Sequence, residues 1–128
     1  MSKQVLKLVS DAMESLGIEY GFATYAGNPI VYPYFVGEYT ETESTTEDGL
    51  QETTISLTGF SRDSWLTLEN AKDRIENYFN RVSGKTVITD NMSAVAIFYA
   101  GSMIVPTNDA ELKSIQINLH VKEWRVNN

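Results

Sequence analysis

The stretch "LKSIQINLHVKEWRV", residues 112–126, alternates apolar and polar side chains over its whole length. Successive side chains of a β-strand point to opposite faces of a sheet, so the alternation predicts a strand with one buried and one wet face. The apolar face carries Ile115, Ile117, Leu119 and Val121. The polar face carries Ser114, Gln116, Asn118, His120 and Lys122. A sheet built on this strand needs a cover on one side only.

Two earlier segments predict a β-hairpin. Residues 52–60 alternate in the same way, with Thr53, Ile55 and Leu57 on one face. Residues 30–41 are dense in Val, Tyr and Phe and also predict a strand, although Pro33 lacks a backbone donor and favours an edge or a strand start. Between them "TETESTTEDG", residues 40–49, ends in a turn signal, which joins the two strands.

Two segments have the spacing of amphipathic helices. Residues 3–16 place apolar side chains three and four apart, and Gly17 suits a left-handed C-terminal cap. The second helix can begin at Ser64 or Thr67 and end at Gly84. Its apolar stripe consists of Leu68, Ala71, Ile75, Tyr78, Phe79 and Val82.

The remaining segments are less regular. "AVAIFYAGSMIV", residues 94–105, is apolar on both faces, which favours a central strand covered on both sides, with a helix as the competing interpretation. Residues 106–111 predict a loop, and residues 18–29 predict a turn-rich connection in which "EYGFATY" is a candidate short strand. The elements then follow in the order helix, strand, strand, helix, strand, strand. We therefore expect one α+β domain over residues 1–128, with an antiparallel sheet of about four strands and two helices on one face.

The charge is distributed unevenly along the chain. Residues 1–61 contain two basic and nine acidic side chains, whereas residues 62–128 contain eight of each, so the net charge of −7 belongs to the first half. An acidic surface repels phosphate, and we expect no nucleic-acid partner. No apolar stretch approaches the ~20 residues of a membrane span, and the N-terminus does not resemble a signal peptide, so we expect a soluble protein.

We expect no catalytic residues, cofactor or metal. There is no cysteine, and His120 has no nucleophile or orienting carboxylate near it in sequence. The acids around Glu41 and Glu43 do not follow the spacing of a calcium loop. Tyr32, Tyr34 and Tyr39 lie close together with no basic residue between them, which favours sheet packing over base stacking.

One part of the chain resembles a known family. The run "YPYFVGEYTETESTTEDGLQETTISLTGFSRD", residues 32–63, precedes the helix "LENAKDRIENYF", residues 68–79. This order of an aromatic phrase, an acidic loop, a Thr-rich strand ending in "SR" and an amphipathic helix is similar to the tail-completion, or tail-terminator, proteins of long-tailed bacteriophages and prophages. The stretch "SMIVPTNDAELK", residues 102–113, matches no motif of that family.

The resemblance implies a structural protein of the virion. It implies a ring, usually of six subunits, that caps the tail tube and meets the head connector, with the tail tube protein and the connector protein as partners. It carries no catalytic residues. The alternative from the composition is a small acidic binding module, such as an inhibitor that occupies a basic site on a protein target.

The candidate partner interface combines an acidic and a basic part. The acidic part is the loop of the predicted hairpin, which can steer a complementary basic surface or serve only to keep the chain in solution. The candidate interface residues are Glu41, Glu43, Glu47, Asp48, Arg62 and Arg125.

Overall fold

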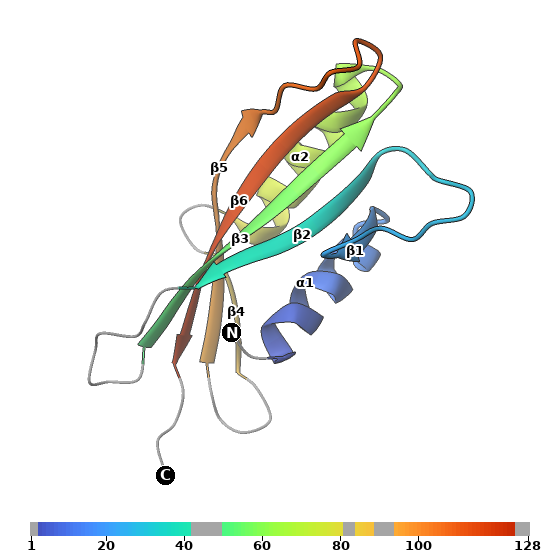
Figure 1. Ribbon diagram of the computed structural model, residues 1–128. Coiled ribbons are helices and arrows are strands. Elements are labelled where there is room, and N and C mark those ends of the chain that lie inside the picture. Colours follow the sequence, from blue (N-terminus) through green and yellow to red (C-terminus); the bar gives the residue numbers. More distant parts are fainter. Residues whose placement is uncertain (1–2, 42–49, 81–83, 89–93, 125–128) are drawn as a thin grey trace.

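The computed structural model describes residues 3–41, 50–80, 84–88 and 94–124. These residues form helices and strands in the order helix, three strands, helix, three strands (Figure 1). The elements are α1 (Lys3–Ser15), β1 (Glu19–Phe22), β2 (Tyr34–Glu41), β3 (Leu50–Ser61), α2 (Trp65–Phe79), β4 (Lys85–Ile88), β5 (Ala94–Ile104) and β6 (Lys113–Trp124).

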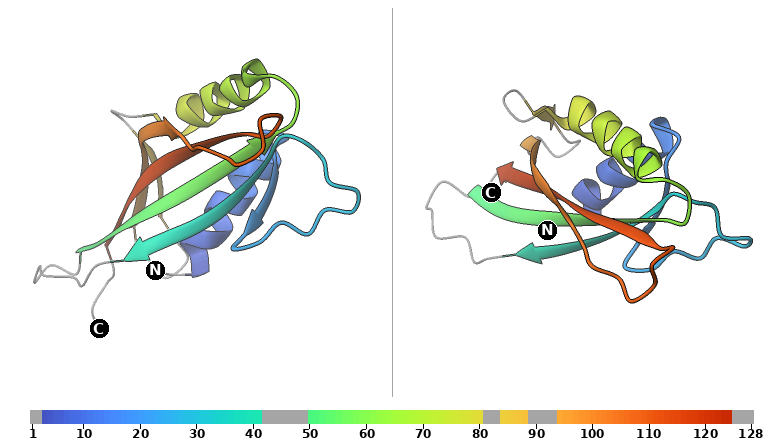
Figure 2. Two further views of the ribbon diagram at one scale, coloured as in Figure 1. Left: turned by 45° about the horizontal axis from the view of Figure 1, so that its top comes forward. Right: turned by 90° about the horizontal axis from the view of Figure 1, so that it is seen from above.

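The strands form one mixed sheet in the order β1-β2-β3-β6-β5-β4. β1 runs parallel to β2, and every other neighbouring pair is antiparallel. The sheet curls, and both helices lie against its inner face (Figure 2). The outer face has no helix over it in the described part of the chain, which explains why β3 and β6 alternate between buried and more exposed residues.

The expected four-stranded antiparallel sheet is therefore wrong. The sheet has six strands because a short strand, β1 or β4, adds to each edge. β1 confirms the candidate short strand within "EYGFATY", whereas β4 was not predicted. Each has four residues, which is too few to show a clear period of two in the sequence. β1 is parallel because residues 23–33 form a long connection that returns the chain to the same end of the sheet.

The described residues also give no support to the expected ring of six subunits. The sheet of one chain accounts for all of the strand pairing in the described part. The function proposed below does not depend on a ring.

The core lies between the inner face of the sheet and the two helices. The predicted alternation is confirmed for the apolar faces of β6 and β3, whose named residues are buried: Ile115, Ile117, Leu119 and Val121, and Thr53, Ile55 and Leu57. Ser114, which was expected on the wet face of β6, is buried as well. The predicted stripe of α2 is confirmed at Leu68, Ala71, Ile75 and Phe79, all fully buried, while Tyr78 packs at the margin. Val82 lies outside the described residues. The α1 residues Val5, Val9, Ala12 and Met13 belong to the same cluster.

α1 ends as its sequence predicts. Gly17 has φ = 70°, the left-handed conformation that glycine adopts without steric cost. Its N–H donates to the carbonyl of Glu14, and the N–H of Ile18 donates to the carbonyl of Met13, each at 3.0 Å. This pair of bonds is a Schellman cap, and it turns the chain directly from the helix into β1.

α2 ends earlier than expected. The helix stops at Phe79, followed by Asn80 with φ = 40°, so Gly84 does not cap it. Ser64 occupies the N-cap position, as predicted, but its side chain makes no capping bond to the helix backbone. Its hydroxyl lies 3.3 Å from that of Thr67 instead.

β5 is a strand, but it is not the central strand that its composition favoured. β3 and β6 occupy the centre, and β4 pairs with β5 only from Ala94 to Ile97. The first half of β5 is largely buried, whereas Ser102, Met103 and Ile104 are exposed. The apolar composition therefore predicted the burial of the first half of β5 but not the exposure of its second half.

A close contact fixes the pairing of β2 with β3. Phe35 lies directly opposite Gly59 on the inner face, and a Cβ atom at Gly59 would overlap the Phe35 ring. The fully buried aromatic ring thus occupies the space that a side chain on the neighbouring strand would need. This packing ties the register of the hairpin to the core.

Replacing Ile75 by alanine should lower the free energy of unfolding by about 2–5 kcal/mol, because the side chain is fully buried between α2 and the sheet. Asn77→Ala on the exposed side of α2 is the control and should change it by less than about 0.5 kcal/mol. Urea unfolding measures both. Equal changes in the free energy of unfolding for the two substitutions would show that the packing of α2 on the sheet does not depend on its apolar stripe.

Candidate functional site

The predicted hairpin places the acidic residues at one end of the sheet. β2 pairs with β3 from Tyr34 opposite Phe60 to Glu41 opposite Thr53. Glu41 is exposed at the last position of β2, and Glu52, next to its partner Thr53 on β3, is exposed as well. We call Glu41 and Glu52 the acidic end; Glu38, opposite Ser56, is exposed nearer the middle of the hairpin. Glu43, Glu47 and Asp48 lie outside the described residues.

Arg62 lies at the other end of the same hairpin. It follows the last residue of β3, whereas the acidic end surrounds the first residues of that strand. A strand advances about 3.3 Å per residue, so the twelve residues of β3 place the two ends roughly 35 Å apart. Arg125 lies outside the described residues. Among the described residues, the structure therefore does not bring Arg62 together with the acidic end.

Arg62 is paired with a loop residue that the sequence did not single out. Its Nη1 donates to Oδ2 of Asp109 at 2.7 Å, and both side chains are nearly half exposed. The hydrogen bond from Arg62 lowers the pKa of the Asp109 carboxyl, and the amide of Glu111 adds to this effect. An exposed pair of this kind adds little stability, but it positions the guanidinium at the end of β3.

Four aromatic rings lie beside Arg62 on the outer face. The centroid of Tyr34 is 4.5 Å from that of Tyr25, 5.3 Å from Phe60 and 5.7 Å from Tyr32. Asp109 first, and Tyr32 after it, raise the pKa of the Arg62 guanidinium. We call these four rings, with Arg62 and Asp109, the aromatic–arginine end. Its rings are half-buried, so each contributes an accessible surface.

The expected grouping of Tyr32, Tyr34 and Tyr39 is only partly correct. Tyr32 and Tyr34 do meet, but Tyr39 lies on the inner side of β2 and stacks on Phe22, with a centroid distance of 6.0 Å. Residues 34 and 39 differ in parity along one strand, so their side chains must point to opposite faces. That signal was present in the sequence. The contributions of Tyr25 and Asp109 come from loops and had no local signal.

The only histidine has a carboxylate near it after all. Nε2 of His120 lies 3.6 Å from Oε1 of Glu52 on the neighbouring strand, with both side chains partly exposed. Within the described ranges, no three His, Cys, Asp or Glu side chains are grouped so that they could hold a metal ion. An exposed His–Glu pair on an open sheet face supplies no bound nucleophile or pocket for chemistry.

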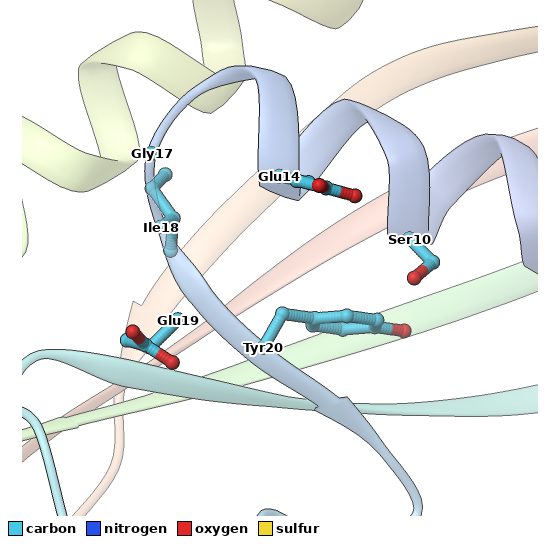
Figure 3. A pocket seen from close by; sticks show the side chains of 6 residues that line it. All are labelled: Ser10, Glu14, Gly17, Ile18, Glu19 and Tyr20. Carbon is cyan, nitrogen blue, oxygen red and sulfur yellow. The ribbon is translucent and has the colours of Figure 1, made fainter. Parts of the chain in front are cut away.

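An open pocket of about 360 Å³ lies between α1 and β1 (Figure 3). It is lined by Ser10, Glu14, Gly17, Ile18, Glu19 and Tyr20. Tyr20 extends beneath the helix toward Ser10 (Figure 3). Burial raises the pKa of Tyr20 to about 12, so this hydroxyl stays protonated at neutral pH and can only act as a hydrogen-bonding group. Glu14 and Glu19 are exposed, so the pocket holds no desolvated carboxylate.

Comparison with known proteins assigns no family. No protein-family model matches the chain, and no curated protein matches its sequence. No helix in the described residues is long and apolar enough to cross a membrane.

The burial of Tyr20 predicts a specific loss of stability at high pH. Its pKa is about 12 in the folded chain and 10.0 for a free tyrosine, so the unfolded state loses this proton first. The contribution of protonated Tyr20 to the free energy of unfolding is complete below pH 10. It is lost as the pH rises from 10 toward 12. Tyr20→Phe should therefore lose less stability over that interval than the wild-type chain. Urea unfolding at several pH values checks this, with Tyr39→Phe, at an exposed side chain, as a control that should follow the wild type.

Proposed function

We propose that this chain is a tail-completion protein of a long-tailed bacteriophage or prophage, which closes the tail tube and takes part in joining the tail to the head. It would work in the host cytoplasm during assembly and then at the neck of the virion. Its partners would be the tail tube protein and the head connector protein. The residue pattern over residues 32–79 is what suggests this family.

One observation carries the proposal: two chemically different surfaces lie at opposite ends of a single hairpin. The acidic end surrounds the connection between β2 and β3, and the aromatic–arginine end lies where β3 leaves the sheet. A joining protein must contact two different bodies at once. Rigid strands roughly 35 Å long hold the two surfaces at a fixed separation, which suits that task.

The chemistry of each end suggests the kind of partner surface. Exposed carboxylates attract a basic rim and accelerate its approach, although they add little affinity. Tyrosine and arginine are the residues most often responsible for binding energy at protein interfaces. We therefore assign the steering of assembly to the acidic end and the tight contact to the aromatic–arginine end.

An inhibitor of a basic target would need only one of these surfaces. The acidic end alone could occupy a basic site, and the aromatic–arginine end would then have no role. The second surface is the reason to prefer a joining protein.

A phage or prophage whose gene for this chain is deleted should make defective particles. We expect tail tubes of uncontrolled length, or tails that do not attach to heads, because nothing closes the tube. Electron microscopy of lysates measures tube length and the fraction of joined particles. Normal virions from the deletion strain would contradict the proposed function.

Joining should also depend on salt through the acidic loop. Attraction between exposed charges is screened beyond about 10 Å at 0.1 M salt, so joining should be faster at low salt. A variant that carries four amides in place of loop acids should join more slowly, with a flatter dependence on salt. The substitutions are Glu41→Gln, Glu43→Gln, Glu47→Gln and Asp48→Asn.

A control variant with the same net charge tests whether position matters. It carries four amides at acids that lie outside the hairpin: Glu14→Gln, Asp73→Asn, Glu76→Gln and Glu111→Gln. The control should keep the wild-type dependence of the joining rate on salt. If the two variants behave alike, the loop acids serve solubility only, and the steering role is wrong.

A further inference from the structure

Each edge of the sheet is only half covered. β1 lies along β2 from Tyr34 to Gly37, and β4 lies along β5 from Ala94 to Ile97. Beyond these pairs, no strand of the described chain lies beside the ends of β2 and β5. Figure 1 shows β4 beside the lower part of β5, while the arrowhead of β5 forms the margin of the sheet. An open edge offers backbone groups to any chain that can pair with it.

The two open edges differ in charge. The open part of β2 carries Glu38 and Glu41, and charged side chains are a common protection against pairing at an edge. The open part of β5 carries none, because no charged residue occurs between Asp90 and Asp109. Its exposed side chains are uncharged instead, and two of them are large and apolar, with Met103 55% and Ile104 68% exposed. Only the β2 edge is protected.

The backbone of β5 is suitably oriented for pairing. The N–H of Val105 donates to the carbonyl of Ser114 at 2.9 Å, so Val105 and Met103 direct their backbone groups toward β6. Because direction alternates along a strand, Ser102 and Ile104 direct theirs away from the sheet. An irregularity in the pairing between Tyr99 and Gly101 bounds this segment on one side.

Pro106 bounds the segment on its other side. Its parity matches that of Ser102 and Ile104, but proline has no N–H to donate. The open, uncharged edge is therefore confined to Ser102, Met103 and Ile104 and their immediate neighbours. A segment this short can hold one short partner strand and no more.

We propose that this segment is a self-association site, at which β5 of one copy pairs antiparallel with β5 of a second copy. A two-fold axis at Met103 places Ser102 of each copy opposite Ile104 of the other. Two such pairs, each exchanging both backbone bonds, give about four hydrogen bonds. Met103 then lies opposite Met103 of the second copy. The contact uses the same patch on both chains, so it closes as a dimer.

Charge favours a second copy as the occupant of this edge. Residues 62–128, which include β5 and its neighbours β4 and β6, contain equal numbers of acidic and basic side chains. Two copies can therefore approach through β5 without the repulsion that two β2 edges would meet. The contact is shorter than the standard interface of about 1,600 Å², so we expect a weak dimer. This inference does not rest on the proposed function.

Sedimentation velocity between about 10 and 500 µM protein tests the site, since this range covers weak dimers. The wild-type chain should shift from monomer to dimer as its concentration rises. Met103→Lys should raise the dissociation constant more than about tenfold, because it places two like charges opposite each other at the axis. Met103→Glu should do the same. An equimolar mixture of the two variants should restore the dimer through a Lys–Glu pair.

Thr40→Lys is the matched control, because it adds the same charge at an exposed position near the other open edge. It should leave the dissociation constant unchanged. A wild-type chain that stays monomeric up to 500 µM overturns the proposal and assigns the edge to another occupant or to none. Single variants that dimerise like the wild type, or a mixture that shows no recovery, also overturn it, because either result removes Met103 from the axis.

Discussion

The structure depends on the pairing of β3 with β6. These two strands of twelve residues each pair along their full length, from Leu50 opposite Trp124 to Ser61 opposite Lys113. Each has one apolar face, so the pair defines a dry side that must be covered and a wet side that need not be. α2 covers the dry side directly, and β2 and β5 add to the pair as the other halves of its two hairpins.

The sequence predicted the elements that bury a long, regular face. Helix periodicity located α1 and α2, and the period of two located β3 and β6, because each signal repeats over a dozen residues. β4 was missed because four residues cannot repeat a pattern, and β1 was expected only as a candidate short strand within "EYGFATY". The direction of β1 was also hidden, since the parallel pairing of Tyr20 with Phe35 depends on the path of residues 23–33 and not on either strand.

The part of the candidate site that consists of charged residues close together in the sequence could be predicted. The hairpin bounded by Glu41 and Leu50 could be located because acids and turn residues lie together in the sequence. The aromatic–arginine end could not be assembled in this way, because Arg62 and Asp109 are 47 residues apart. Both lie in connections, and the meeting of two connections is decided by the order of strands in the sheet. That order is a property of the whole core.

The central pairing also sets how this chain can fold. Partners in β3 and β6 are separated by 52 to 74 residues, and the bond from Arg74 of α2 to the carbonyl of Leu16, the residue after α1, spans 58 residues. A chain must lose the entropy of closing these loops before its central contacts can form. Proteins dominated by such distant contacts fold more slowly than helical bundles of similar size. The hairpins β2–β3 and β5–β6 can form locally, but neither has a complete core until they meet, so we expect their encounter to limit the folding rate.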